Sequence, residues 1–311
     1  MNEGRKKDIV TAQILVPLDG SPLAEQALGC AMTLGRGLPA ELILFRAVSI
    51  PPDTTEILNN AGLEAAALME QLEVEANDYL RKVASELQDA GLSVRQVVQQ
   101  GPAAEAIVDY AEQQGIQQIV MTTHGYTGIS RWTHGSVAER VLQSARVPVF
   151  LVRAQEGELG VLREPMPCQR ILVPLDGSAV AEQVLPSAIS IAQAFGAEMV
   201  LFQVPIVYFA GSLVGEWYLP FQGVLGTAER DAQAYLDRVA CRLKEQGVNV
   251  STAMQIGAVA ESIIGYAEAN RIDLIAMCTH GRTGRGRWTL GSVADRVLRA
   301  SSMPILLVRA K

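Results

Sequence analysis

Short apolar runs alternate with longer amphipathic segments along the whole chain. The first run, residues 14–18, is followed by a helical pattern that opens at Ser21-Pro22 and extends to about residue 35. Apolar runs bounded by turn residues are typical of buried strands, and a period near 3.6 is typical of helices. Further strands are expected at residues 41–48, 94–99, 118–123 and 147–152, and further helices in a segment ending near residue 91, at 103–114 and at 136–145.

The same alternation returns in the second half of the chain. Strands are expected at residues 171–175, 198–204, 249–255, 274–279 and 304–308, and helices at 180–195, 228–246, 259–270 and 292–300. Strands that alternate with helices imply right-handed crossovers and a parallel, doubly wound sheet. The hydrophobic content of 49% with only 5% aromatic residues also fits parallel strands buried by helices on both faces.

A repeat explains why the two halves share one pattern. Residues 14–21 return letter for letter at 171–178, and residues 123–154 match residues 279–310 with 20 identities in 32 positions. We therefore predict an α/β protein of two repeated doubly wound domains at residues 9–154 and 170–311, joined by a linker at 155–169. Each domain is expected to hold a five-stranded parallel sheet in the order 3-2-1-4-5, with helices on both faces.

The last strand of each half falls at the end of its sheet in this order. Residues 148–152 and 304–308 are strongly apolar. An exposed apolar edge favours pairing with another strand. We therefore expect the two halves to pack through these strands as an intramolecular pseudo-dimer, and a homodimer of whole chains remains open.

Composition narrows the classes of partner. The formal net charge of −7 argues against a binder of duplex nucleic acid. The four cysteines lack paired spacing, which fits a reducing compartment rather than a disulfide framework. The N-terminus lacks an apolar signal core, and the most apolar loop, residues 205–215, is too short to span a bilayer. A cytoplasmic protein without nucleic-acid or membrane partners is expected.

The connection after the second strand differs most between the halves. In the second half it covers residues 205–226 and holds five aromatic residues, Tyr208, Phe209, Trp217, Tyr218 and Phe221. A loop with this composition is either an interaction surface or a segment folded onto its own domain.

A glycine-rich loop follows the fourth strand of each half and opens a helix. Its glycines and serine are Gly125, Gly128, Gly135 and Ser136 in the first half and Gly281, Gly284, Gly291 and Ser292 in the second. Glycine permits close backbone approach and positive φ, and unpaired amides at a helix N-terminus bind anions. The alternative is a tight turn with the serine as a helix cap. Two copies favour phosphate binding.

An aspartate ends the first strand of each half. Asp19 and Asp176 fall at the carboxyl edge of the expected sheet, where open parallel sheets bind ligands. A carboxylate at this edge can accept hydrogen bonds from ribose hydroxyls or hold a divalent cation. An Asx-turn within Asp-Gly-Ser is an equally good interpretation.

Together these motifs resemble the universal stress protein family. The resemblance rests on Val-Pro-Leu-Asp-Gly-Ser, on Gly-Pro-Ala-Ala-Glu-Ala-Ile at 101–107 and on Thr-His-Gly…Gly-Ser-Val-Ala, and it covers both halves. It implies ATP as the ligand, with magnesium as a candidate companion ion. It also implies that Asp19 and Asp176 face the ribose and that the backbone of Ala47 and Val204 contacts the adenine.

The chain departs from the family's ATP-binding signature at one position in each half. Thr122 and Cys278 stand where that signature has its first glycine. His124 and His280 follow and could lie near a phosphate, although a histidine here more often only ends the strand. Cys278 and His280 lack further partners at zinc spacing, so no metal site is expected.

Three functions therefore compete. The leading one is a regulatory protein of the stress response that binds adenine nucleotides. The second is a slow ATPase, or a transferase, for which His124 and His280 are the candidate acid–base groups. The third is an interaction module with degenerate sites, which Thr122 and Cys278 favour. The sequence names no protein partner.

Overall fold

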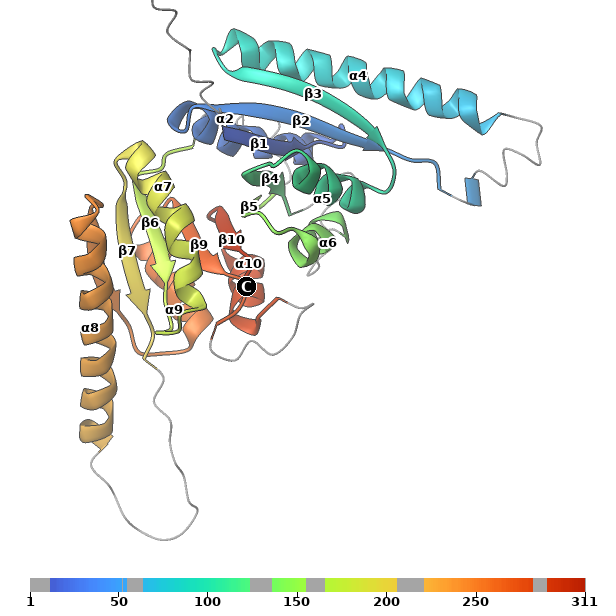
Figure 1. Ribbon diagram of the computed structural model, residues 1–311. Coiled ribbons are helices and arrows are strands. Elements are labelled where there is room, and N and C mark those ends of the chain that lie inside the picture. The colour runs from blue at the N-terminus through green and yellow to red at the C-terminus, as the bar shows by residue number, and fades with distance from the viewer. Residues whose placement is uncertain are drawn as a thin grey trace, which may run out of the picture.

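A single mixed sheet runs through the whole molecule. The computed structural model describes residues 12–51, 53–54, 64–123, 136–154, 166–205, 221–281 and 290–310. Within these ranges ten strands follow the order β3-β2-β1-β4-β5-β10-β9-β6-β7-β8 (Figure 1). The strands are β1 (Ala12–Pro17), β2 (Ala40–Val48), β3 (Ser93–Gln100), β4 (Gln118–Thr122), β5 (Val149–Val152), β6 (Arg170–Pro174), β7 (Glu198–Gln203), β8 (Val250–Met254), β9 (Leu274–Cys278) and β10 (Ile305–Val308).

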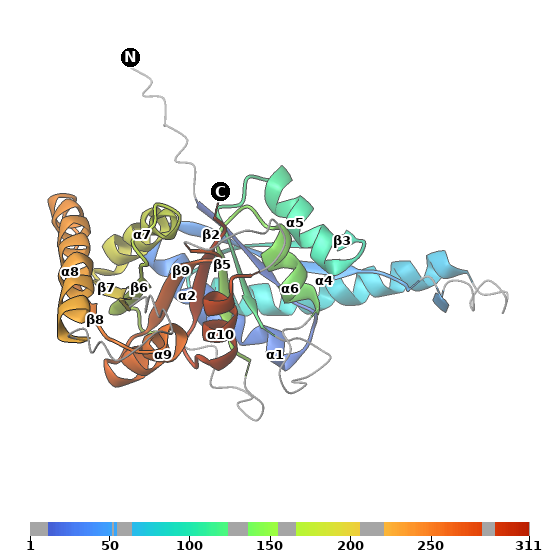
Figure 2. The same cartoon turned by 90° about the horizontal axis from the view of Figure 1, so that it is seen from below.

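The two halves meet where β5 pairs with β10. This pairing is antiparallel, with Phe150 opposite Leu306, whereas the strands within each half pair in parallel. The last strands thus lie side by side, as their apolar sequences predicted. The pairing joins the five strands of each half into one sheet, because each last strand offers the other an unpaired apolar edge. Figure 2 shows β5 near the centre and the long helices α4 (Ala65–Asp89) and α8 (Phe221–Glu245) at opposite ends.

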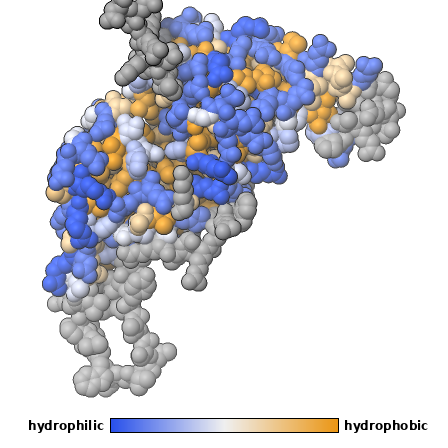
Figure 3. All heavy atoms as spheres, in the orientation of Figure 1, coloured by the Kyte–Doolittle hydropathy of each residue, from blue (hydrophilic) through white to orange (hydrophobic). Residues whose placement is uncertain are grey.

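Helices cover both faces of the sheet, as predicted. One face carries α1 (Pro22–Glu25), α2 (Ala27–Gly37), α4 (Ala65–Asp89), η1 (Ala181–Val184), α7 (Leu185–Phe195) and α8 (Phe221–Glu245). The other carries α5 (Ala103–Gln113), α6 (Ser136–Ser144), α9 (Val259–Ala269) and α10 (Ser292–Ala300). Successive residues of a strand point to opposite faces, so Leu42 and Leu44 join one core and Ile43 and Phe45 the other. Figure 3 shows apolar atoms scattered among hydrophilic ones on the outside.

Two helix starts differ from expectation. The helix expected at 180–195 divides into the 3-10 turn η1 and α7, because Pro186 lies in the first turn of α7 and has no amide hydrogen to continue a helix through it. Helix α8 begins at Phe221, whereas the sequence suggested a loop as far as residue 226. Gly226 lies inside that helix with open space around it, and an exposed helical glycine costs only about 1 kcal/mol. Residues 206–220, with four of the five aromatic residues noted there, lie outside the described ranges.

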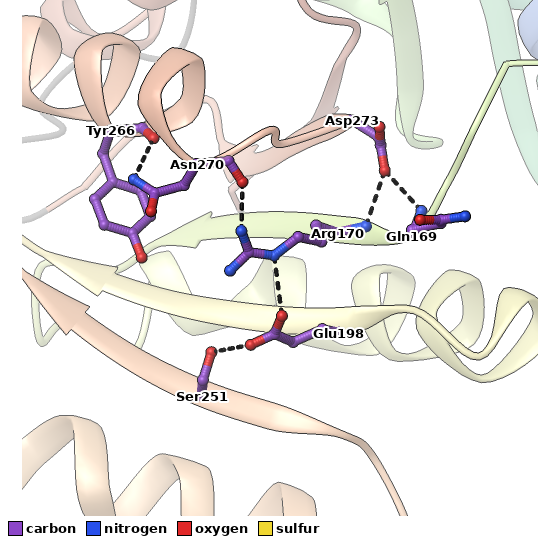
Figure 4. A network of polar contacts seen from close by, with 7 residues as sticks. All are labelled: Gln169, Arg170, Glu198, Ser251, Tyr266, Asn270 and Asp273. Atoms are coloured by element: carbon purple, nitrogen blue, oxygen red, sulfur yellow. Dashed lines mark hydrogen bonds and ion pairs between the residues drawn. The ribbon is translucent and has the colours of Figure 1, made fainter.

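A polar network ties the amino ends of the strands in the second half (Figure 4). Arg170 of β6 donates through Nε to Glu198 Oε2 of β7 at 2.9 Å, and Ser251 Oγ of β8 donates to Glu198 Oε1 at 2.5 Å. Asp273 Oδ2 accepts from the Arg170 amide at 3.0 Å. The Ser251 hydroxyl, followed by Arg170, holds the pKa of the Glu198 carboxyl below its ordinary value. These contacts hold together the amino ends of the strands, at the opposite side of the sheet from the carboxyl ends where the site was predicted.

Candidate functional site

The loops that follow β1 and β6, with Asp19 and Asp176, lie at the carboxyl edge of the sheet. Asp176 Oδ1 accepts hydrogen bonds from the Ser178 amide at 2.9 Å and from Ser178 Oγ at 2.6 Å. In the first half, Asp19 Oδ1 accepts from the Ser21 amide at 2.9 Å. Gly20 and Gly177 between them have φ of +87° and +84°. The Asx-turn interpretation is therefore confirmed. The turn uses Oδ1 of each carboxylate.

Gly281 makes room for the second oxygen of Asp176. A Cβ on Gly281 would lie 2.3 Å from Asp176 Oδ2, a distance that no side chain can occupy. Gly281 follows β9 and Asp176 follows β6, and these two strands are neighbours in the sheet. The glycine thus permits the close approach of the carboxylate. Gly281 and Gly291 do not use the positive φ that glycine permits, so close approach is the reason for Gly281.

Gly291 is the N-cap residue of α10. Its φ and ψ are −62° and 147°, and its amide donates to the Thr279 carbonyl at 2.8 Å. A Cβ here would lie 2.9 Å from that carbonyl oxygen, so the helix start packs against the end of β9 without space for a side chain. Ser292 is the first helical residue and is exposed. The interpretation of Ser292 as a helix cap is therefore wrong, because Gly291 holds that position.

These elements enclose a cavity of about 170 Å³. One wall is apolar and contains Phe202, Val204, Val259, Ile263 and Met277. The other wall is polar and contains Asp176, His280, Gly281, Gly291 and Ser292. The cavity thus brings together every described residue that the sequence nominated in the second half. Of its apolar wall the sequence nominated only Val204 and missed the rest, although Phe202 lies two residues earlier in the chain and so shares a face with Val204.

Cys278 and His280 are held by neighbouring groups. The Cys278 thiol is buried and donates to the Ala181 carbonyl with an S···O distance of 3.5 Å. Burial raises its pKa to about 12, so the thiol stays protonated at neutral pH. His280 Nδ1 lies 3.1 Å from Thr279 Oγ1. Within the described ranges no three His, Cys, Asp or Glu side chains gather as metal ligands.

The first half repeats part of this geometry. The rings of Phe45 and Tyr110 lie in tilted contact with centroids 5.2 Å apart, as those of Phe202 and Tyr266 do at 4.8 Å. Thr122 is buried at the end of β4, and Ala47 packs against the same core as Phe45. The nominated residues His124, Gly125, Gly128, Gly135 and Gly284 lie outside the described residues, and Ser136 is described only as the start of α6.

Arg46 distinguishes the first site from the second. Its guanidinium Nη1 lies 3.2 Å from the place of a Cβ on Gly20, next to the Asp19 loop, and it stacks over Tyr79 at 5.2 Å. The repeat places Gln203 at the equivalent position of β7, so the second half lacks this cation. The repeated sequence contains this difference, but outside the motifs that mark the site.

The comparisons with known proteins follow the repeat. The sequence model of the universal stress protein family matches residues 11–153 and again residues 167–309. The chain belongs to the universal stress protein family. The match of both halves agrees with the resemblance seen in the sequence, and universal stress proteins recur among the relatives of the chain.

Some relatives match about half of the chain and others match nearly all of it. A universal stress protein of Methanocaldococcus jannaschii is 36% identical over 143 residues, which cover 45% of this chain and 82% of that protein. One of Synechocystis is 24% identical over 316 residues, which cover 95% of this chain and 99% of that protein. The crystal structure of a universal stress protein from Archaeoglobus fulgidus matches 96% of this chain and 97% of its own, with a TM-score of 0.69 and 20% identity. That likeness shows the fold.

No described helix is both long and apolar enough to cross a membrane.

Proposed function

We propose that this universal stress protein binds adenine nucleotides and acts as a regulatory protein of the stress response, with the ligand at the carboxyl edge of the sheet. The observation that carries the proposal is one cavity in which an apolar wall, a carboxylate and a helix N-terminus face one another. A nucleotide has three matching parts, namely an aromatic base, a ribose with hydroxyl donors and a chain of phosphates.

The apolar wall suits the base. Phe202 is fixed by its contact with Tyr266, and Ile263 and Met277 complete a surface on which a purine can lie. The backbone of Val204, just after β7, is the proposed contact for the edge of the adenine, and backbone groups can read that edge whatever the side chain.

Asp176 and the start of α10 suit the ribose and the phosphates. Asp176 Oδ2 points toward Gly281 and is the proposed acceptor for the ribose hydroxyls. The first amides of α10, at Ser292 and Val293, have no partner within the helix and lie at the positive end of its dipole. Gly281, Gly284, Gly291 and His280 complete the proposed second-half site. A magnesium ion would be held chiefly by phosphate and water, because Asp176 is the one carboxylate among the described residues that line the cavity.

The first half offers the matching proposal. Asp19 would face the ribose, and the backbone of Ala47 would face the base beside Phe45. His124, Gly125, Gly128, Gly135 and Ser136 would form the phosphate loop by the repeat.

A degenerate interaction module is the second candidate, favoured by the side chains of Thr122 and Cys278 in place of glycine. The hydrogen bond of Cys278 weakens this argument for a degenerate site, since it holds the thiol at the Ala181 carbonyl. We found no described nucleophile–base pair that would favour the ATPase.

Mass spectrometry of the ligand released from denatured purified protein tests the proposal. The expected ligand is an adenine nucleotide. Protein that releases none, and that binds none of ATP, ADP or AMP when these are added in excess, would instead support the interaction module. Adenosine and inorganic triphosphate, tested separately as competitors, show which part of the cavity contributes.

A further inference from the structure

Two arginines occupy equivalent positions directly after the last strand of each half. Arg153 follows β5 and Arg309 follows β10. Arg309 Nη1 donates to the Ser144 carbonyl at 3.1 Å, and Arg153 Nη1 donates to the carbonyls of Ala300 at 3.5 Å and Ser301 at 3.4 Å. Ser144 ends α6 and Ala300 ends α10. Each guanidinium therefore lies at the C-terminal end of a helix that belongs to the other half.

The antiparallel pairing of β5 and β10 causes this crossing. Leu307 is opposite Val149, and continuing the register places Arg309 opposite residue 147, in the turn that leads from α6 into β5. By the same register Arg153 lies opposite Met303, just after α10. In antiparallel strands the carboxyl end of one strand always meets the amino end of the other. A residue after either strand thus reaches the helix that precedes its partner strand.

A cation at this place stabilises a helix. The last carbonyls of a helix have no partner within it, and they form the negative end of its dipole. Helices α6 and α10 have only nine residues each. A contact that holds the C-terminal end of such a short helix therefore also fixes the position of its N-terminal end. The other ends are Ser136 and Gly291-Ser292, the proposed phosphate-binding starts of the two helices.

The backbone beside Arg309 is bound to its own half's site. The Thr279 amide donates to the Val308 carbonyl at 2.9 Å, and the Ala310 amide donates to Thr279 Oγ1 at 3.3 Å. The Thr279 carbonyl accepts the Gly291 amide at 2.8 Å. The strand end that carries Arg309 is therefore tied to the second-half cavity, whereas its side chain caps the helix of the first half.

We propose that Arg153 and Arg309 are positioning residues, each for the site of the other half. This assignment rests on the nucleotide-binding function proposed above, but the crossed capping can be measured without a ligand. Each site helix is held at its C-terminal end by the opposite half, so neither half keeps its phosphate-binding helix in place alone. The two sites are coupled through this pair of contacts.

Hydrogen exchange of the full-length protein without ligand tests the capping. Arg309→Met is expected to raise amide exchange in α6 by about two- to fivefold and to leave α10 unchanged, and Arg153→Met is expected to do the reverse. Lysine at either position keeps the charge and should restore most of the protection. Arg81→Met is the control, because Arg81 is an exposed arginine whose ion pair is with Asp78 of its own helix, α4, at 2.6 Å, away from both site helices. This control should change neither helix.

Nucleotide titration then tests the effect on the sites. In an Asp19→Ala background only the second site should bind ATP. There Arg153→Met should weaken ATP binding by about two- to fivefold, and Arg309→Met should leave it unchanged. In an Asp176→Ala background, where only the first site should bind, Arg309→Met should weaken ATP binding and Arg153→Met should not. A variant that acts on the helix of its own half, on both helices equally or on neither would overturn the proposal. If the crossed exchange pattern appears but no variant or wild type binds nucleotide, the capping stands and the proposed function fails.

Discussion

A single methyl group on Gly281 provides a sharp test of the second-half cavity. The backbone of Gly281 does not have positive φ, so alanine introduces no conformational strain there. Its Cβ, however, would lie 2.3 Å from Asp176 Oδ2 and 3.3 Å from Asp176 Cγ. Since favourable contacts between heavy atoms begin near about 3.5 Å, the carboxylate must move by roughly 1 Å in Gly281→Ala.

This movement breaks the hydrogen bonds that hold the carboxylate. Asp176 Oδ1 accepts from the Ser178 amide at 2.9 Å and from Ser178 Oγ at 2.6 Å. Hydrogen bonds to a charged group contribute about 1.5–3 kcal/mol each, and loss of the equivalent of one should lower the free energy of unfolding by that amount. If Asp176 also holds the ribose, the second site should lose at least about tenfold in nucleotide affinity, since about 1.4 kcal/mol corresponds to a factor of ten.

Denaturant unfolding and nucleotide titration of Gly281→Ala measure both effects. Gly265→Ala is the matched control, because Gly265 lies inside α9 and a Cβ there would meet no atom within 4 Å. The control should gain about 0.5–1 kcal/mol, as alanine favours a helix over glycine. Equal stability of the two variants, together with unchanged affinity in Gly281→Ala, would refute the assigned closeness of Gly281 and Asp176.

Two further predictions concern the sheet. Phe150→Ala at the junction of the halves should cost about 3–5 kcal/mol and destabilise both halves, because Phe150 is 1% exposed in a core that continues from one half into the other; hydrogen exchange that increases in one half only would contradict this. Since the pKa of Glu198 is lowered by Ser251 and then by Arg170, its contribution to stability is fully present above its ordinary pKa and is lost as the pH falls through the lowered value. Stability measured from neutral to acid pH should fall less steeply in Glu198→Gln, and identical slopes would count against the network.

The repeat made most of the fold predictable. Strands such as residues 171–175 and 304–308 were expected within one or two residues of their observed bounds, because apolar runs between turn residues are a local signal. The sequence also assigned three site residues to the carboxyl edge of the sheet. Asp176 follows the carboxyl end of β6, Gly281 follows that of β9, and Gly291 opens the helix after β9.

Long-range contacts account for what the sequence did not reveal. The reason for Gly281 is the Asp176 carboxylate, which lies more than a hundred residues earlier in the chain. The crossed contacts of Arg153 and Arg309 depend on the register of β5 against β10, which no local pattern specifies. For Arg46 the sequence shows the difference from Gln203, but not its neighbours, Gly20 and Tyr79, which come from other parts of the chain.

Calorimetric titration of the full chain with ATP, in the wild type and in Asp176→Asn, tests the central claim most directly. Asparagine keeps the oxygen that accepts from Ser178 but removes the charge proposed to face the ribose. Asp237→Asn on α8 is the control, because Asp237 is exposed and accepts a hydrogen bond from Gln233 at 2.8 Å. We predict saturable binding by the wild type and by Asp237→Asn, and weakened binding at one site in Asp176→Asn. Wild type that gives no saturable binding, or Asp176→Asn that binds ATP as the wild type does, would contradict the proposed nucleotide site.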